Sequence, residues 1–208
     1  PRIPYYIYNQ QPGVFEGRIS GDPTNLATFE DQDTRSFHGL YPAGGKFDDG
    51  SGGVTNGDMG EKGAGKYRMM TNAMRIFIEA EAVASLGVTG SASLDALFEQ
   101  GIRESMKKVN ELGVSPMSQG TIDTYVNNRM AEFTAADNTG KLRLVMMEKY
   151  VLQFGNGMEQ YNDWRRTGYP DNLDLGFITG VTLNRFPYPS SEKPPTTPIN
   201  SEFVFWDN

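Results

Sequence analysis

Apolar residues recur at helical spacing through the middle of the chain, between residues 67 and 168. Side chains three and four positions apart share one face of a helix, so this pattern predicts amphipathic helices. The five expected ranges are 71–86, 93–112, 122–135, 139–154 and 158–166. Thr71 is a cap residue at the start of the first helix. The expected stop residues are Gly87, Gly113, Gly155 and Gly168. Short connections between such helices predict antiparallel neighbours, as in a bundle or a helix-pair solenoid.

The first expected helix carries two apolar stripes rather than one. The stripes are Met70, Ala73, Met74, Phe77 and Ile78 on one side, and Ile76, Ala80, Val83 and Ala84 on the other. Each stripe has to be removed from water by a neighbouring element. The pattern therefore predicts that this helix packs on two sides.

The segments before and after the helical region are poor in helical pattern. Residues 1–66 open with a β-prone aromatic run, Ile3 to Tyr8, which is compatible with a short edge strand. Ten glycines then fall between Gly39 and Gly65, and so long a loop is uncommon unless it is functional or disordered. Residues 169–208 are rich in proline and predicted to be extended. We interpret residues 1–208 as part of one domain with a loop-rich segment (1–66), a helical segment (67–168) and an extended tail (169–208).

Composition excludes several classes of function. The chain has 19 Lys and Arg against 26 Asp and Glu, a net charge of −7, which argues against a nucleic-acid partner. There is no cysteine, so disulfides and thiolate metal sites are excluded from this stretch. The one histidine, His38, excludes a two-histidine metal site, and no activated nucleophile is recognisable beside it. No run of about 18 apolar residues is present to span a bilayer as a helix.

Two loop motifs invite a ligand-binding interpretation. Residues 60–66 fit the phosphate-loop pattern GxxxxGK, but Tyr67 replaces the hydroxyl residue that holds magnesium and no apolar strand precedes Gly60. A glycine-rich lead-in to the first helix is therefore the favoured interpretation. The acidic residues between 48 and 58 have the oxygen ligands that calcium prefers. Their spacing is not that of an EF-hand, so a solvated turn is favoured over a calcium site.

Glu79 and Glu81 lie in an apolar helix, where a carboxylate pair invites an acid–base interpretation. The favoured alternative is structural. Arg165 and Arg166 lie in a later helix, and buried carboxylates are usually paired. Trp164, between two polar residues, is interpreted as a core anchor rather than as a sugar-stacking residue.

Three blocks of sequence carry a resemblance to a known family. They run from Tyr67 to Ala82, from Glu148 to Pro170 and from Arg185 to Glu192, and the run Asn162-Asp163-Trp164-Arg165-Arg166-Thr167-Gly168 is the most specific of them. In this order they resemble the SusD-like (SusD/RagB homologue) outer-membrane lipoproteins of Bacteroidetes. The resemblance covers essentially the whole chain, which is similar to the C-terminal part of a longer family member. The family often has Asp before the Pro-Arg pair that opens this chain, so we expect that the natural chain was cut before Pro1 or continues there.

The resemblance implies a mainly α fold of tetratricopeptide-like helix pairs overlaid by long irregular loops. It also implies a nutrient-binding lipoprotein, not an enzyme, on the cell-surface face of the outer membrane. Such a protein captures an oligosaccharide or an oligopeptide and forms a lid over a SusC-like TonB-dependent β-barrel transporter. Its lipid anchor would belong to the N-terminal remainder of the protein. A glycan-active enzyme and a structural helical adaptor stay open as alternatives.

Ligand contacts are expected on loops, because exposed aromatic rings stack on sugar faces and loop carboxylates bind hydroxyls. The ligand-binding candidates are Phe37, His38, Tyr41, Phe47, Asp48 and Asp49. No cofactor is expected, and calcium is the one ion that the acidic loop suits.

Overall fold

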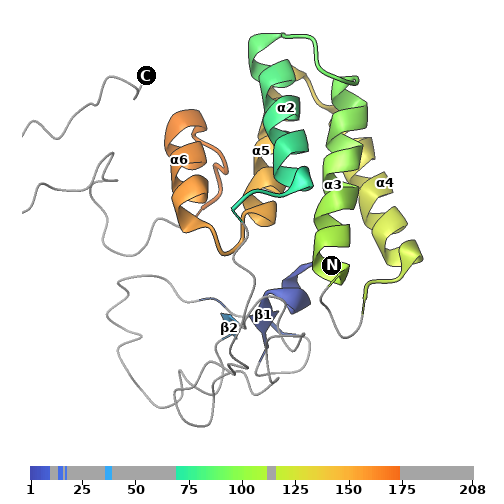
Figure 1. Cartoon of the computed structure of the whole chain (residues 1–208), viewed down its shortest axis with the longest axis vertical. Coiled ribbons are helices and arrows are strands. Elements are labelled where there is room, and N and C mark those ends of the chain that lie inside the picture. Colours follow the sequence, from blue (N-terminus) through green and yellow to red (C-terminus); the bar gives the residue numbers. More distant parts are fainter. Residues whose placement is uncertain (10–13, 16, 18–35, 39–68, 112–115, 174–208) are drawn as a thin grey trace, which may run out of the picture.

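The computed structural model describes residues 1–9, 14–15, 17, 36–38, 69–111 and 116–173. Most of this part is helical, which confirms the expected mainly α fold (Figure 1). The helices are α2 (Asn72–Leu86), α3 (Leu94–Asn110), α4 (Gln119–Ala135), α5 (Asn138–Leu152) and α6 (Gly157–Thr167). A 3-10 helix, η1 (Ile3–Tyr5), and two short strands, β1 (Ile7–Tyr8) and β2 (Phe37–His38), lie below them in Figure 1.

Each described α-helix begins where a polar side chain accepts a hydrogen bond from a backbone N–H of the first turn. The cap residues are Thr71, Ser93, Ser118, Asp137 and Asn156. Such a cap satisfies a donor that has no partner within the helix. Because Ser118 is the cap, α4 begins at Gln119, three positions before the expected start at Ile122. Gly87 and Gly168 end α2 and α6 with φ of 65° and 74°, a left-handed conformation that glycine adopts without strain.

The core lies where α2 packs against α3 and α5, and α3 packs against α4 (Figure 1). Phe77, Phe98 and Phe133 are fully buried there, and the rings of Phe98 and Phe133 stack with centroids 4.1 Å apart. Gly101 in α3 lies directly against the ring of Phe77. A Cβ at Gly101 would stand 2.8 Å from Phe77 Cζ, so the missing side chain is what lets α2 and α3 approach this closely.

The two-sided packing of α2 is confirmed, with two exceptions in the first stripe. Members of both stripes are buried: Ala73, Met74, Phe77, Ile76 and Ala80. Met70 and Ile78 were expected in the first stripe, but they are 64% and 46% exposed. Met70 precedes the helix, and the face that carries Ile78 is not covered by the described part of the chain.

The expected strand over Ile3 to Tyr8 is wrong in its first half. Residues 3–5 form η1, in which the N–H groups of Tyr5 and Tyr6 donate to the carbonyls of Arg2 and Ile3. Pro4 explains the difference, because its fixed φ suits a helical first turn and it has no N–H for a strand ladder. Pairing begins only at Ile7, where β1 runs antiparallel to β2.

Several sequence-based expectations concern residues that lie outside the described ranges. They include the glycine-rich loop 39–65, the GxxxxGK motif at 60–66, the expected stop at Gly113 and nearly all of the tail, 174–208. Within the ranges that are described, none of the helices has the length and hydropathy needed to cross a bilayer.

Candidate functional site

Two of the six ligand-binding candidates, Phe37 and His38, form strand β2. The strand pairs with β1 in the register Ile7 with His38 and Tyr8 with Phe37. The start of the candidate ligand segment is therefore held by the N-terminal residues through main-chain hydrogen bonds. Tyr41, Phe47, Asp48 and Asp49 lie outside the described residues, so their role and the calcium interpretation stay predictions. Among the residues that the structure describes, no three His, Asp or Glu side chains form a group suited to a metal ion.

The N-terminal residues that hold β2 are themselves fixed to the helices at two points. The ring of Tyr6 is buried and stacks on Phe154, just after α5, with centroids 4.5 Å apart. Arg2 is only 3% exposed, and its guanidinium enters the space between α3, α4 and α5. Buried arginine is rare unless it is paired, so its partners decide what this contact contributes.

The partners of Arg2 form a buried group that we call the Glu148 cluster: Arg2, Ser105, Tyr125, Arg129 and Glu148. Arg2 donates to Ser105 Oγ at 2.7 Å and to Glu148 Oε2 at 2.5 Å. The other oxygen, Glu148 Oε1, accepts from Tyr125 Oη at 2.6 Å and from Arg129 Nε at 2.9 Å. Both oxygens of the Glu148 carboxylate, which is 2% exposed, therefore accept hydrogen bonds. This pairing is the condition for burying a charged group without a large desolvation penalty.

The electrostatics of this cluster keep Glu148 ionised. Burial works against the charged form, but the charge of Arg2 and the hydrogen bonds from Tyr125 and Arg2 outweigh it and lower the pKa of Glu148 below its ordinary value. Burial and the neighbouring carboxylate raise the pKa of Tyr125 to about 12. Tyr125 therefore stays a hydrogen-bond donor over the whole physiological pH range.

A second group, the Lys149 cluster, joins α2, α5 and α6, and all of its members are buried except Arg166, whose side chain is 51% exposed. Its members are Glu81, Lys149, Gln153, Asp163 and Arg166. Lys149 Nζ lies 2.8 Å from Glu81 Oε2 and 2.9 Å from Asp163 Oδ2. Arg166 pairs with Glu81 and lies 2.9 Å from Asp163 Oδ1. Gln153 donates to Asp163 Oδ2 at 2.9 Å.

The structure brings together only part of the expected carboxylate–arginine arrangement. Glu81 meets Arg166, but Glu79 does not meet either arginine. Glu79 instead lies 3.0 Å from Arg75 and accepts from the N–H of Ser91. Glu79 is two positions from Glu81, about 200° around the helix, so the two side chains leave opposite sides of α2.

The other two expected structural residues lie on the half-buried side of α6. The guanidinium of Arg165 stands over the ring of Tyr161, 5.6 Å from its centroid. Trp164 is half-buried, with its ring 6.3 Å from that of Tyr161. Lys149 is among the cluster residues to which the sequence pattern assigned no role. The sequence feature that could have indicated its role is a lysine on an otherwise apolar face of the helix, directly after Glu148.

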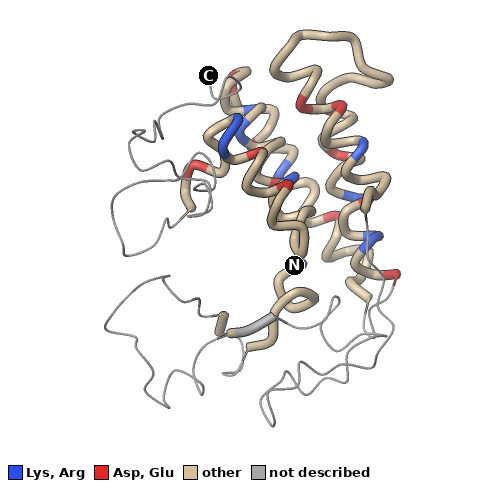
Figure 2. Tube along the Cα trace, turned by 60° about the vertical axis from the view of Figure 1, so that its left-hand side comes forward, with Lys and Arg blue, Asp and Glu red and all other residues tan. Residues whose placement is uncertain are grey.

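Every carboxylate oxygen of the two clusters accepts a hydrogen bond from an Arg, Lys, Tyr or Gln side chain. Such an arrangement holds helices in register and leaves no carboxylate facing an open space where a substrate would sit. In Figure 2 the positive and negative positions are interspersed along the described helices instead of gathering by sign. The chemistry of the described clusters is therefore that of packing rather than acid–base catalysis.

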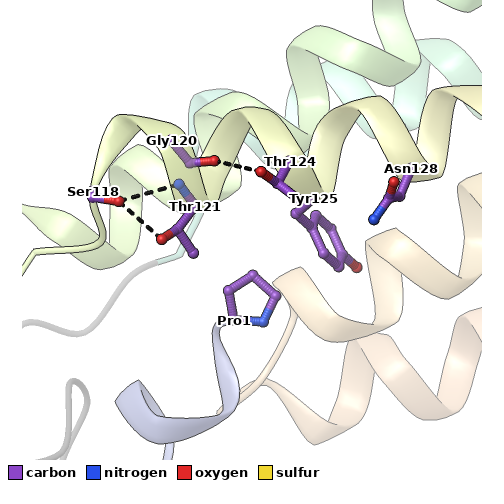
Figure 3. Close-up of a pocket in the computed structure, with 7 residues that line it drawn as sticks. All are labelled: Pro1, Ser118, Gly120, Thr121, Thr124, Tyr125 and Asn128. Carbon is purple, nitrogen blue, oxygen red and sulfur yellow. Dashed lines mark hydrogen bonds between the residues drawn. The ribbon is translucent and has the colours of Figure 1, made fainter.

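One surface hollow is lined by the first half of α4 and by the N-terminal residue (Figure 3). Its volume is about 630 Å³, and its lining residues are Pro1, Ser118, Gly120, Thr121, Thr124, Tyr125 and Asn128. The lining side chains are hydroxyl, amide and ring groups. Ser118 and Thr121 hydrogen-bond to each other at 2.9 Å, and Thr124 donates to the carbonyl of Gly120. The apolar pattern of the sequence does not reveal this stripe, because Ser118, Gly120 and Thr121 precede the expected start of the helix at Ile122.

Comparison with known proteins identifies the class to which this arrangement belongs. Residues 1–189 match the SusD-like family described as "Starch-binding associating with outer membrane", and the chain belongs to this family. Its members are generally non-catalytic binding proteins. No curated protein matches the chain.

A solved structure is similar to this chain, the protein described as "Bacteroidetes AC2a SusD-like". It is 26% identical, with a TM-score of 0.50, over 59% of this chain and 24% of that chain. The chain thus spans about a quarter of the length of this relative.

Proposed function

We propose that this chain is the C-terminal part of a nutrient-binding lipoprotein on the cell-surface face of the outer membrane. The family match over residues 1–189 carries the proposal, because the family description joins starch binding to outer-membrane association. In this proposal the protein forms a lid over a SusC-like TonB-dependent β-barrel, and its lipid anchor belongs to the N-terminal remainder.

The proposed ligand is an oligosaccharide held by aromatic and polar loop side chains. Rings stack on the apolar faces of sugars, and carboxylates and imidazole bind their hydroxyls. The proposed contact residues are Phe37, His38, Tyr41, Phe47, Asp48 and Asp49. An oligopeptide ligand is the alternative that the binding test has to separate.

Co-purification tests the proposed location and partner. Native outer membranes are extracted with detergent, the protein is isolated through a C-terminal tag, and everything that travels with it is weighed. A barrel of transporter size and a lipidated N-terminal part are expected. Recovery of the protein alone, in the aqueous fraction without detergent, contradicts the lid role.

Titration calorimetry with maltoheptaose on the purified full-length complex tests the ligand. Saturable binding with no new reducing ends is expected. Release of reducing ends indicates a glycan-active enzyme, and binding of a peptide mixture without binding of maltoheptaose indicates the peptide alternative.

Tyr41→Ala and Phe47→Ala are each expected to weaken binding about threefold to tenfold, from the loss of ring stacking. The control Phe15→Ala removes an exposed aromatic residue that is not a candidate and is expected to leave the affinity unchanged. Unchanged affinity in both test variants contradicts the proposed site.

A further inference from the structure

The N-terminal segment, residues 1–8, connects strand β2 to the helices through strand pairing, hydrogen bonds and a ring contact. It runs from Arg2, buried among α3, α4 and α5, through η1 to the stacked ring of Tyr6 and then to β1. β1 in turn carries β2 by antiparallel pairing. The attachment of this segment to the helices therefore contributes to the position of β2 on the helical body.

Arg2 is the stronger of the two attachment points. Its two terminal nitrogens donate to three side chains from three helices: Ser105 on α3, Tyr125 on α4 and Glu148 on α5. A charge-assisted hydrogen bond of this kind is stronger than a neutral one, and Arg2 is the only described partner of Glu148 Oε2. Withdrawal of Arg2 leaves this oxygen buried without a donor, so the attachment opposes release of the whole segment.

We propose that Arg2 is a positioning residue, whose insertion between α3, α4 and α5 fixes β2, and with it Phe37 and His38, against the helical body. The consequence for ligand binding rests on the proposed function. The consequence for the structure does not, because it concerns only the coupling between Arg2, β1 and β2.

Hydrogen exchange followed by mass spectrometry on the full-length protein tests the coupling. In Arg2→Met the amides of residues 5–8 and 36–38 are expected to exchange about tenfold faster or more, while the amides of α2 and α3 keep their wild-type rates. Arg2→Lys restores a positive charge near Glu148 but not the forked contact with Ser105 and Tyr125, so it is expected to restore protection in part. Arg103→Met is the matched control. Arg103 is also bonded to two carboxylates, Glu99 and Asp123, but it is 36% exposed and these partners lie on α3 and α4 rather than in residues 1–8.

A second variant covers the case in which Arg2→Met fails to fold. In Arg2→Met/Glu148→Gln no buried carboxylate is left unpaired. The amides of the helices are therefore expected to keep their protection from exchange, while the amides of residues 5–8 and 36–38 still exchange rapidly. In the wild type, the two ranges are expected to open together, with one common dependence on urea. Residues 36–38 that keep their protection in the variants, or that open independently of residues 5–8 in the wild type, overturn the proposal.

The affinity for maltoheptaose separates this proposal from the proposed function. Arg2→Met is expected to weaken it about tenfold with the helices intact, and Arg103→Met to leave it unchanged. Faster exchange with unchanged affinity overturns the positioning role for the ligand. If the wild type itself does not bind maltoheptaose, the exchange data still decide whether Arg2 fixes β2, and only the ligand assignment is rejected.

Discussion

Glu148 and Lys149 are neighbours in α5, yet their side chains enter two different buried clusters. Consecutive residues leave a helix about 100° apart, so Glu148 faces α4 and the N-terminal segment while Lys149 faces α2 and α6. These two adjacent residues therefore connect α5 to α2, α4, α6 and the N-terminal segment. Every described carboxylate oxygen of both clusters accepts a hydrogen bond. The stability of this helical unit therefore depends on each buried charge remaining paired with its hydrogen-bond donors.

Lys149→Met is expected to destabilise the protein by about 3–5 kcal/mol, because it leaves Glu81 and Asp163 with less compensation in a buried site. Urea unfolding followed by circular dichroism measures the change. Lys107→Met is the control, since Lys107 is 67% exposed and lies 3.7 Å from Glu104. Its effect is expected to stay below about 1 kcal/mol. Equal effects of the two substitutions contradict the structural importance of the Lys149 cluster.

Gly101→Ala is expected to destabilise the protein by about 1–2 kcal/mol, because overpacking against Phe77 outweighs the better helix propensity of alanine. Thermal unfolding measures the change. Gly120→Ala is the matched control in an exposed first turn, where the nearest atom to an added Cβ is 3.9 Å away. That substitution is expected to be neutral or slightly stabilising. A stabilised Gly101→Ala variant would show that α2 and α3 separate without cost.

Acid is expected to remove the contribution of Glu148 to stability. The pKa of this group is lowered in the folded state from its ordinary value of 4.5. Its contribution is therefore present above pH 4.5 and is lost as the pH falls through the lower folded value. The difference in free energy of unfolding between wild type and Glu148→Gln is expected to shrink from about pH 7 to about pH 3. A difference that stays constant over this range contradicts the direction of the shift.

Asp137→Ala is expected to cost about 1 kcal/mol, because Asp137 Oδ1 accepts from the N–H of Gly140 at 2.7 Å and caps α5. Asp137→Asn keeps an acceptor at the cap and is expected to change stability by less than about 0.5 kcal/mol. Chemical unfolding of the two variants side by side checks the pair. Equal losses would mean that the charge of Asp137, and not its cap hydrogen bond, supports the helix.

For the candidate site, the sequence offered only residue types and no spatial arrangement. Aromatic and acidic loop residues after Phe37 led us to expect a ligand segment there, which stays a prediction, and nothing in their spacing indicated that β2 would pair with residues 7 and 8. The hollow along α4 was missed for a local reason. Apart from Gly120, every exposed position from Ser118 to Asn128 is polar, so the apolar pattern that defines a helix starts only at Ile122.

The sequence by itself determined which segments of this protein form helices, because apolar spacing and cap residues are set by neighbours within about four residues, although the pattern placed the start of α4 three residues late. Thr71 and Gly87 bound α2 in the structure as the pattern predicted. The partners of buried charges were decided only by the tertiary structure. Glu81 and Lys149 are 68 positions apart, and whether they meet depends on how α2 and α5 pack, which rotates one glutamate inward and leaves Glu79 outside. Arg2 likewise has its role only because the fold returns the N-terminal segment to a space formed by three helices.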